Sequence, residues 1–446
     1  MSVCINVPAH AKVVLDLLEA AGFEAYVVGG CVRDSLLGLT PLDWDVCTKA
    51  SPQESLRVFA DYHCIKTGLQ HGTITVMVNK QPVEVTTYRL DGTYSDNRHP
   101  DAVQFVSDLR EDLARRDFTV NAMAYSPTRG LVDCFNGQQD LQARLIRCVG
   151  VATERFEEDG LRIMRALRFA SRFGFALDAE TTKAIRSGRE LLLNVSVERI
   201  YKELKGVLVG SGARSMMMYF PEVFRIILPE LEPMIDFEPH NKHHAYALWE
   251  HTAHAVAAIP ADDVLRLAAL FHDCGKPATY QVALNDEGSY IGHAHEGYLI
   301  AQKALRRLKS DNASMDAVTT LVANHMAVLP TRRAGMRHLI GRLGLPALKQ
   351  LFQLKRASLK AQQSSNYPDR LQEITIAEDL MEEVLALPAC YTIKDLAITG
   401  NDLIAMGMKP GPDMKRVLDM LLLRVQDEAL NNDLESLRQL AKDFMK

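Results

Sequence analysis

The chain lacks the cysteine pattern of a zinc cluster or of a disulfide-stapled secreted protein. Its eight cysteines are scattered, and no two of them are separated by only two residues. Zinc clusters and small secreted scaffolds both need cysteines at close, regular spacings. The cysteines are therefore expected to be reduced thiols, as in a cytoplasmic protein.

Long hydrophobic runs are also missing. No stretch reaches about 18 uncharged apolar residues, the length that a membrane-spanning helix requires. The segment 7–23 repeats apolar residues at helical spacing but includes Asp16 and Glu19, unlike the apolar centre of a signal peptide. We expect neither a membrane span nor a signal peptide, and no membrane partner.

The composition has no strong bias of any kind. Hydrophobic residues make up 47% and charged residues 24%, and no segment is of low complexity, so disordered and fibrous proteins are excluded. The net charge of −5 argues weakly against a nucleic-acid partner, although a locally basic face would still serve. A length of 446 residues predicts about three or four domains.

Periodicity along the chain predicts a multidomain α+β protein. Residues 1–150 alternate helical and strand patterns, which indicates an α/β head. Residues 151–230 are predicted to form an all-helical neck, followed by a linker rich in proline and charge. A histidine-dense helical body is expected over 231–370, and a helical tail over 371–446. The oligomeric state is not predicted.

Two carboxylates stand close together at the start of a predicted strand over 44–47. Side chains alternate along a strand, so Asp43 and Asp45 point to one face and Trp44 to the other. Parallel carboxylates repel unless a cation lies between them, and Mg²⁺ is the cation that such oxygen ligands suit. Glu84, between Val83 and Val85 in a second predicted strand, would complete a three-carboxylate site. A solvated strand face is the alternative for each residue taken alone.

A pair of glycines precedes these acids. Gly29 and Gly30 lie where a predicted strand passes into a predicted helix, and the absence of Cβ atoms lets the backbone approach phosphate oxygens. A plain tight turn is the alternative. The combination of glycine turn and carboxylates within one small domain favours nucleotidyl transfer, in which bound metal ions stabilise the leaving pyrophosphate.

These stretches resemble a known family. "VVGGCVRD" (27–34) and "DWD" (43–45) are similar to the polymerase-beta-like nucleotidyltransferase superfamily. "RRDFTVNAMAY" (115–125), "DCFNGQQDL" (133–141) and "ERFEEDGLRIMRALRFA" (154–170) narrow the resemblance to class II tRNA nucleotidyltransferases, the bacterial CCA-adding enzymes. The resemblance is dense over the first 230 residues.

The resemblance implies roles for individual residues. Asp43 and Asp45 match the family's Mg²⁺ carboxylates, and Glu84 matches a further acidic strand position that we count as catalytic. The nucleotide-binding positions implied are Gly29, Gly30, Arg33, Asp34, Arg115, Arg116, Asp117, Asn121, Glu158, Asp159 and Arg162. The stretch 91–106 resembles a flexible loop of CCA-adding and A-adding enzymes that CC-adding enzymes lack, which disfavours CC addition alone.

Four arginines repeat at helical spacing in the last of these motifs. Arg162, Arg165, Arg168 and Arg172 are predicted to share one helical face, and we include the first three among the nucleotide-binding candidates. Pairing with nearby acids such as Glu158 is the alternative.

Base selection is assigned to the same motif by the resemblance. Cytosine and adenine both present an amino donor beside a ring-nitrogen acceptor, whereas uracil and guanine present the reverse order. Asp159 and Arg162, predicted at i and i+3 of one helix, would offer an acceptor and a donor fork on one face. Such a pair would admit C and A without a nucleic-acid template.

The histidine-dense region resembles an HD-type metal-dependent phosphohydrolase domain. The matching residues are His251, His272, Asp273, His293 and His325, with His295 as an alternative to His293. Imidazole and carboxylate ligands suit Mn, Ni, Fe or Zn, so a second, transition-metal site is expected. Ser358 stands where the HD pattern has a final Asp, which predicts a degenerate site with weak or no hydrolase activity.

The leading hypothesis is therefore an Mg²⁺-dependent enzyme that adds C, C and A to the 3′ end of tRNA from CTP and ATP and releases pyrophosphate. An A-adding enzyme or a poly(A) polymerase is the nearest alternative. A nucleotide-binding regulator or an HD-type phosphohydrolase is the alternative of another class.

Overall fold

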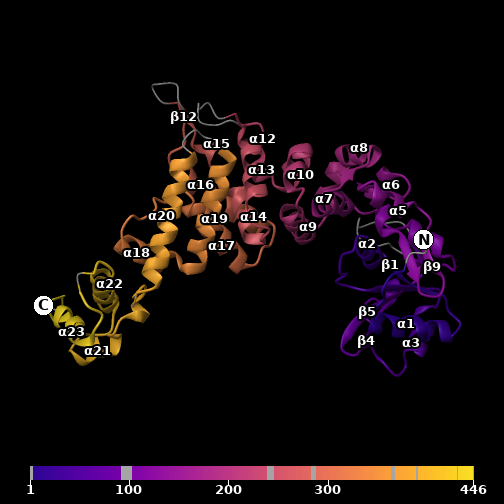
Figure 1. Ribbon diagram of the computed structural model, residues 1–446, viewed down its shortest axis with the longest axis horizontal. Helices are drawn as coiled ribbons and strands as arrows, with labels where there is room; N and C mark the ends of the chain where they lie inside the picture. Colours follow the sequence, from indigo (N-terminus) through magenta and orange to yellow (C-terminus); the bar gives the residue numbers. More distant parts are fainter. Residues whose placement is uncertain are drawn as a thin grey trace. The chain divides into compact units, whose positions relative to one another are not determined.

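The computed structural model describes residues 4–91, 103–238, 246–282, 288–362, 367–387, 390–428 and 430–444. The chain forms two compact units, Met1–Pro229 and Glu230–Lys446 (Figure 1). Among the helices in the described ranges, none combines the length and apolar character needed to cross a bilayer.

The first unit is built on a mixed seven-stranded sheet. Its strands, in spatial order, are β3 (His63–Ile65), β4 (Thr73–Val78), β5 (Gln81–Thr87), β2 (Asp45–Thr48), β1 (Ala25–Val28), β8 (Met123–Ser126) and β9 (Gly130–Asp133). The β2–β5 pair is parallel and the other neighbouring pairs are antiparallel. The parallel pair places Asp45, the first residue of β2, opposite Glu84 in the middle of β5.

Burial explains why these segments are strands. All four residues of β1 are buried, as a central strand covered on both faces requires. In β5, Val83 and Val85 are buried while Glu84 between them is exposed, so one face of this strand packs on the core and the other meets solvent. The predicted strand 44–47 is β2 shifted by one residue, and the second predicted strand, which contains Glu84, is β5.

Helices surround the sheet and continue beyond it. The helices of the first unit are α1 (Ala9–Ala20), α2 (Gly30–Leu36), α3 (Pro52–Val58), α4 (Leu109–Ala114), α5 (Gly137–Gln142), α6 (Ala152–Glu158), α7 (Leu161–Phe173), α8 (Ala179–Gly188), α9 (Val197–Val209), α10 (Ala213–Tyr219) and α11 (Pro221–Ile227). Helix α7 packs against α9 and α10 and ends at Gly174, which takes the left-handed conformation favoured at helix ends.

The prediction that residues 151–230 are wholly helical is wrong in one detail. A two-residue strand, β11 (Ala176–Leu177), pairs in parallel with β10 (Leu145–Ile146) of the preceding segment. After Gly174 ends helix α7, the extended chain satisfies its backbone groups on β10. This pairing ties the neck to the head within the first unit.

The second unit is mainly helical. Its helices are α12 (Glu232–Ile235), α13 (Leu248–Ala258), α14 (Asp263–Phe271), α15 (Lys276–Thr279), α16 (His293–Arg307), α17 (Asn312–Asn324), α18 (Arg333–Leu343), α19 (Leu345–Gln362), α20 (Tyr367–Leu385), α21 (Gly400–Ala405), α22 (Pro412–Gln426) and α23 (Leu434–Phe444). A short hairpin, β12 (Gln281–Val282) and β13 (Gly288–Ser289), accompanies them.

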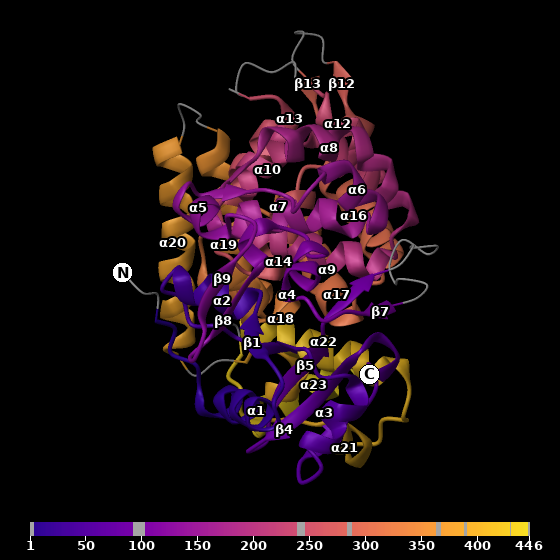
Figure 2. The same cartoon turned by 90° about the vertical axis from the view of Figure 1, so that its right-hand side faces the viewer.

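Helix α19 organises the larger part of this unit. It packs against α13, α14 and α17, and it lies beside α20 in both views (Figures 1 and 2). The boundary expected at 370/371 falls inside α20. A separate apolar cluster begins at Cys390 and joins α21, α22 and α23.

Candidate active site and histidine cluster

The glycine turn lies at the end of β1. Gly29 has φ +80°, a conformation that side chains disfavour, and Gly30 begins helix α2. A Cβ at Gly29 would stand 2.8 Å from Arg116 Nη1. Glycine is therefore needed here both for the backbone conformation and for the close approach of the Arg116 guanidinium.

Two of the three predicted carboxylates lie opposite each other on neighbouring strands, and the third precedes one of these strands. Asp45 opens β2 and lies directly opposite Glu84 of β5 in the parallel register. Asp43 is exposed and precedes β2 by two residues, while Trp44 between them is buried. Burial raises the pKa of Asp45 to about 6, with Glu84 and Asp43 acting in the same direction and Arg116 opposing them. Such a group of negative charges is suited to bind a divalent cation.

Arg33, Asp34 and Asn121 do not face solvent but form a buried network. The Arg33 guanidinium donates from Nε to Asp34 at 2.7 Å and from Nη1 to Asn121 Oδ1 at 2.5 Å. It also lies over the rings of Phe169 and Phe173 in helix α7. These contacts hold the end of the glycine turn against the neck helix.

Asp117 extends this network. It accepts from Asn121 Nδ2 at 3.0 Å and from Arg165 at 2.6 and 2.8 Å. Burial by itself raises the pKa of Asp117, but Arg165 and Asn121 outweigh it and lower the pKa to about 2. Asp117 is thus a buried, ionised carboxylate that joins the head to α7.

Arg115 and Arg116 both face Asp112, a residue that the sequence reasoning missed. Arg115 Nη2 lies 2.8 Å from Asp112 Oδ1, and Arg116 Nη2 lies 3.5 Å from Asp112 Oδ2. Asp112 is fully buried. Its position three and four residues before the arginines, on one helical turn, is the signal that could have identified it.

The helix predicted through "EEDGLR" is broken, which corrects the interpretation of Asp159 and Arg162. Helix α6 ends at Glu158, Asp159 is extended with φ −143° and ψ 101°, and α7 begins at Leu161. A Cβ at Gly160 would meet the Leu191 carbonyl oxygen at 2.8 Å, so this glycine allows close packing at the break. Asp159 and Arg162 therefore do not share a face of one helix.

Both side chains are instead positioned by protein partners. Asp159 accepts from the Leu161 N–H at 3.0 Å and pairs with Arg199 at 2.9 Å. Arg162 is buried, donates to the carbonyl oxygens of Arg155 and Arg115 at 3.0 and 3.1 Å, and pairs with Glu158.

Every arginine of the predicted face has a carboxylate partner. Arg165 pairs with Asp117, Arg168 with Glu203, and Arg172 with Asp34, in addition to the Arg162–Glu158 pair. The alternative given for this face, pairing with acids, is what the structure contains. Three of the four partners are distant in sequence, which is why spacing alone did not reveal them.

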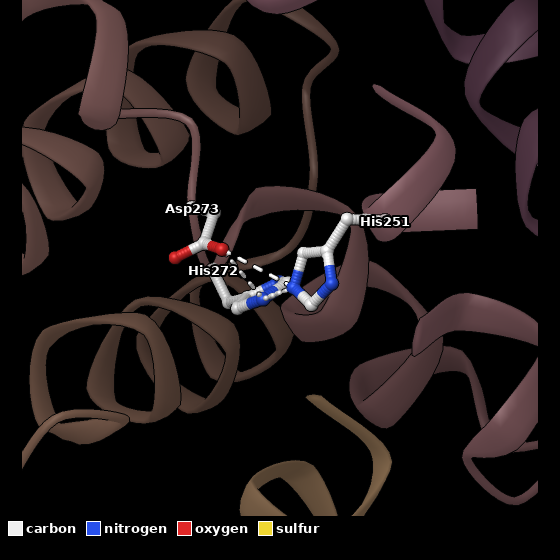
Figure 3. A group of neighbouring side chains, drawn as sticks. All are labelled: His251, His272 and Asp273. Carbon is white, nitrogen blue, oxygen red and sulfur yellow. Dashed lines mark hydrogen bonds and ion pairs between the residues drawn. The ribbon is translucent and has the colours of Figure 1, made fainter. Parts of the chain in front are cut away.

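The predicted HD residues converge in the second unit. His251 comes from α13, His272 and Asp273 follow α14, His293 opens α16, and His325 follows α17. All five side chains are buried. His251 and His272 approach Asp273 Oδ2 at 3.3 and 3.2 Å, as Figure 3 shows. His293 and His325 each lie 3.5 Å from Asp273 Oδ1, whereas His295 is exposed.

Three of these histidines are oriented by backbone carbonyl groups. The Nδ1 atoms of His272, His293 and His325 each lie 2.7 Å from a carbonyl oxygen. A carbonyl can only accept, so each Nδ1 is the donor, and in the neutral ring the Nε2 that faces Asp273 offers a lone pair. This orientation is typical of metal-bound histidines, and it supports a metal-binding role for the cluster.

Two further residues complete the surroundings of Asp273. Lys276, which the sequence reasoning missed, donates to Asp273 Oδ2 at 2.7 Å, and Ser358 Oγ lies 3.3 Å from His272 Nε2. Burial raises the pKa of Asp273, but His272 and Lys276 outweigh it and hold the pKa well below the usual range. The cluster adjoins a cavity of about 820 Å³ that Lys355 and Arg370 also line.

Family models match three parts of the chain. The poly A polymerase head domain matches residues 25–147, and the RNA and SrmB-binding site of polymerase A matches residues 174–235. Domain 2 of tRNA nucleotidyltransferases matches residues 297–441. The first match contains the glycine turn and the three carboxylates.

Curated relatives are similar over nearly the whole chain. The CCA-adding enzyme of Lacticaseibacillus paracasei is 33% identical over 97% of this chain and 95% of its own length. The CCA-adding enzyme of Latilactobacillus sakei subsp. sakei is 32% identical over 97% of this chain and 98% of its own length.

Solved structures share the fold. The Bacillus stearothermophilus CCA-adding enzyme in complex with CTP has a TM-score of 0.72 and 28% identity, covering 97% of this chain and 96% of its own. The Thermotoga maritima CCA-adding enzyme complexed with tRNA has a TM-score of 0.60 and 18% identity, covering 98% and 95% of the two chains. The second similarity concerns the fold alone.

Proposed function

This chain belongs to the family of CCA-adding enzymes, and we propose that it adds C, C and A to the 3′ end of tRNA without a template. CTP and ATP are the substrates and pyrophosphate is the product. The observation that carries the proposal is the convergence of Asp43, Asp45 and Glu84 beside the Gly29 turn, within a chain similar to these enzymes over almost its full length. The same similarity disfavours an enzyme that adds A alone.

Asp43 and Asp45, with Glu84 beside them, would hold Mg²⁺. The chemistry available from bound Mg²⁺ is electrostatic stabilisation of the attacking 3′ oxygen of tRNA and of the leaving pyrophosphate. The raised pKa of Asp45 supports this assignment, because burial and the neighbouring carboxylates both disfavour its negative charge and a bound cation would offset that cost.

Arg116 is proposed to bind the triphosphate. Its guanidinium group packs closely against Gly29, and within the described parts of the chain its Nε has no hydrogen-bond partner. Arg115 lies beside it, and both arginines are positioned by Asp112. The buried network is proposed to position this turn; it consists of Arg33, Asp34, Asp117 and Asn121. We propose that Arg165 and Arg168 hold the neck helix in place.

Asp159 and Arg162 are proposed to select the base. Asp159 would accept from the exocyclic amine of C or A, and Arg162 would donate to the ring nitrogen beside it. Arg199 pairs with Asp159, and Glu158 pairs with Arg162. The acceptor and the donor would therefore already be held in position when a nucleotide binds. Because a fixed acceptor and donor read one hydrogen-bond order, U and G would be rejected.

Incubation with tRNA lacking its 3′ CCA, one labelled nucleotide at a time, tests the proposal. Incorporation of both CTP and ATP supports CCA addition. Incorporation of ATP alone would support an A-adding enzyme, and incorporation of neither would contradict nucleotidyl transfer.

The remaining regions are assigned by the same proposal. The head (1–150) carries catalysis, the neck (151–230) selects the nucleotide, and the tail (371–446) contacts tRNA. The flexible loop expected over 91–106 lies mostly outside the described residues. A cytoplasmic location is supported by the eight cysteines, all free in the structure.

The histidine cluster favours a second function for the body (231–370). We propose an HD-like site that binds a transition metal such as Mn, Ni, Fe or Zn through His251, His272, Asp273, His293 and His325. Ser358 supplies no anionic ligand, so phosphohydrolase activity is expected to be weak or absent. Strong metal-stimulated phosphatase activity that is lost in His272→Ala would contradict this expectation.

A further inference from the structure

The histidine cluster has two halves that share one carboxylate. His251, His272 and Lys276 face Asp273 Oδ2. His293 and His325 face Asp273 Oδ1. The two groups of His and Asp ligand atoms can each hold an ion, with Asp273 belonging to both.

The half at Oδ1 consists of acceptors that point at one another. The Nε2 atoms of His293 and His325 are 3.1 Å apart and 3.5 Å from Oδ1. Both rings use their Nδ1–H on the carbonyl oxygens of Tyr290 and Val322, so in their neutral forms both Nε2 atoms bear lone pairs. Three converging acceptors repel unless a proton or a metal cation lies among them, and a metal cation can satisfy all three at once.

The half at Oδ2 already contains a cation. The Lys276 ammonium group lies 2.7 Å from Oδ2, within normal hydrogen-bond distance. The Ser358 hydroxyl, 3.3 Å from His272 Nε2, can donate to the lone pair of that ring. The need for a further positive charge is therefore smaller at this half.

The adjoining cavity also favours an ion at the Oδ1 half. Asp273, His293 and His325 line it, together with Lys276 and Ser358. His251 and His272 are not among the described residues that line it. An ion at the Oδ1 half would reach the cavity, where water or an anionic ligand can complete its coordination.

We propose that the cluster binds its first transition-metal ion through Asp273 Oδ1, His293 and His325, while Lys276 takes the place of an ion at the other half. This inference rests on the proposed metal binding of the cluster. The proposed ion would therefore not be bound by His251 and His272, although both match the HD sequence pattern. Two imidazoles and one carboxylate form a ligand set that leaves open coordination positions.

Cobalt titration of the 446-residue chain tests the placement. Co²⁺ is added to metal-free protein, and bound metal is measured by mass spectrometry after gel filtration and by visible absorption. The wild type is expected to bind one ion per chain. His293→Ala and His325→Ala should each weaken binding by at least ~10-fold, and His251→Ala by less than about 3-fold. His295→Ala, which changes an exposed neighbour on α16, is the matched control and should leave binding unchanged.

A gain of binding gives an independent test. Lys276→Met combined with Ser358→Asp removes the competing ammonium group and supplies a carboxylate beside His272, so the stoichiometry should rise from one ion to two. His325→Gln, which keeps a polar side chain of similar size, serves where His325→Ala fails to fold by circular dichroism.

Two results would overturn the placement: two ions bound by the wild type, or loss of the ion in His251→Ala with retention in both His325 variants. Absence of Co²⁺ from the wild type is a different result. It would contradict metal binding by the cluster as a whole.

Discussion

Asp45 is held where its own ionisation is unfavourable. It is partly buried at the start of β2, directly opposite Glu84 and two residues from Asp43. Its pKa of about 6 means that, without a bound cation, the ionised side chain costs the folded protein stability at neutral pH. The grouped negative charges of this site are thus suited to binding a cation, although they lower the stability of the cation-free protein.

Asp45→Asn should therefore stabilise the metal-free protein while removing transfer activity. The folded pKa of Asp45 lies above its ordinary value of 3.8, so the destabilisation is fully present above pH 6 and fades as the pH falls toward 3.8. We expect the free energy of unfolding to rise by about 1–2 kcal/mol at pH 7.5 and by less at pH 5. Urea titrations in EDTA at the two pH values measure this. Asp61→Asn, at an exposed carboxylate of the same unit, is the control; a loss of stability in Asp45→Asn would contradict the account.

Asp117 shows the opposite behaviour. Its folded pKa of about 2 lies below the ordinary 3.8, so its contribution to stability is fully present above about pH 4 and is lost as the pH falls toward 2. Asp117→Asn leaves Arg165 without its carboxylate and should cost about 2–4 kcal/mol at pH 7. Denaturant titration checks the cost. An effect below about 0.5 kcal/mol would mean that the Asp117–Arg165 pair does not join the head to α7.

The proposed base selection depends on the break between α6 and α7. Asp159 is extended and Gly160 packs against the Leu191 carbonyl, so Asp159 lies before the break and Arg162 lies in the first turn of α7 after it. Arg162 also donates to two backbone carbonyl groups. Any substitution of Arg162 therefore disturbs folding as well as selection, and Asp159 is the better position to change.

Asp159→Asn should relax the choice of base. An amide can accept from the amine of C or donate to the oxygen of U, whereas a carboxylate can only accept. We expect the ratio of UTP to CTP incorporation to rise by about 10-fold or more, since one mispaired contact is worth roughly 1–3 kcal/mol. Single-nucleotide incorporation rates measure the ratio. Glu157→Gln, at an exposed neighbour, is the control; an unchanged ratio in a folded, active Asp159→Asn protein would assign selection to another element.

Gly160→Ala tests the break itself. A methyl group there meets a backbone oxygen at 2.8 Å, so the two helices must shift, with an expected loss of about 1–3 kcal/mol in stability and reduced transfer. At Gly188 the added methyl would meet only side-chain ends, those of Leu191 at 3.3 Å and Ile163 at 3.8 Å. Thermal unfolding should separate the two variants, and equal behaviour would contradict the packing argument.

The elements of the head could be predicted from sequence because each follows a local rule. Four buried apolar residues predicted β1, and alternation around Glu84 predicted β5. The break at Asp159 was missed because arginines and apolar residues continue at helical spacing through the motif, and one glycine does not by itself end a helix. The partners Asp117, Glu203 and Arg199 were missed because tertiary packing, not spacing, brings them to α7 and Asp159.

At the scale of the whole chain, the two proposed metal sites lie in different compact units. The carboxylates of the first unit are oxygen ligands suited to Mg²⁺, and the imidazoles of the second favour transition metals. The metal requirements of the two sites should therefore be separable by experiment in one protein.

Removal of tightly bound metal should leave nucleotide transfer intact. After dialysis against EDTA, addition of Mg²⁺ alone is expected to restore C and A addition fully, although the histidine cluster remains empty of transition metal by mass spectrometry. Recovery that also required Co²⁺ or Mn²⁺ would show that the two units depend on each other.

The most direct test of the account is single-nucleotide incorporation into tRNA lacking its 3′ CCA. It compares the wild type with Asp43→Ala and Asp45→Ala, each in Mg²⁺ and with folding verified by circular dichroism. The wild type should incorporate CTP and then ATP but neither UTP nor GTP, and both variants should lose C and A addition together, because one carboxylate site serves every transfer step. Near-normal transfer by either folded variant, or loss of only one of the two nucleotides, would contradict the assignment of Asp43 and Asp45 as the catalytic metal ligands.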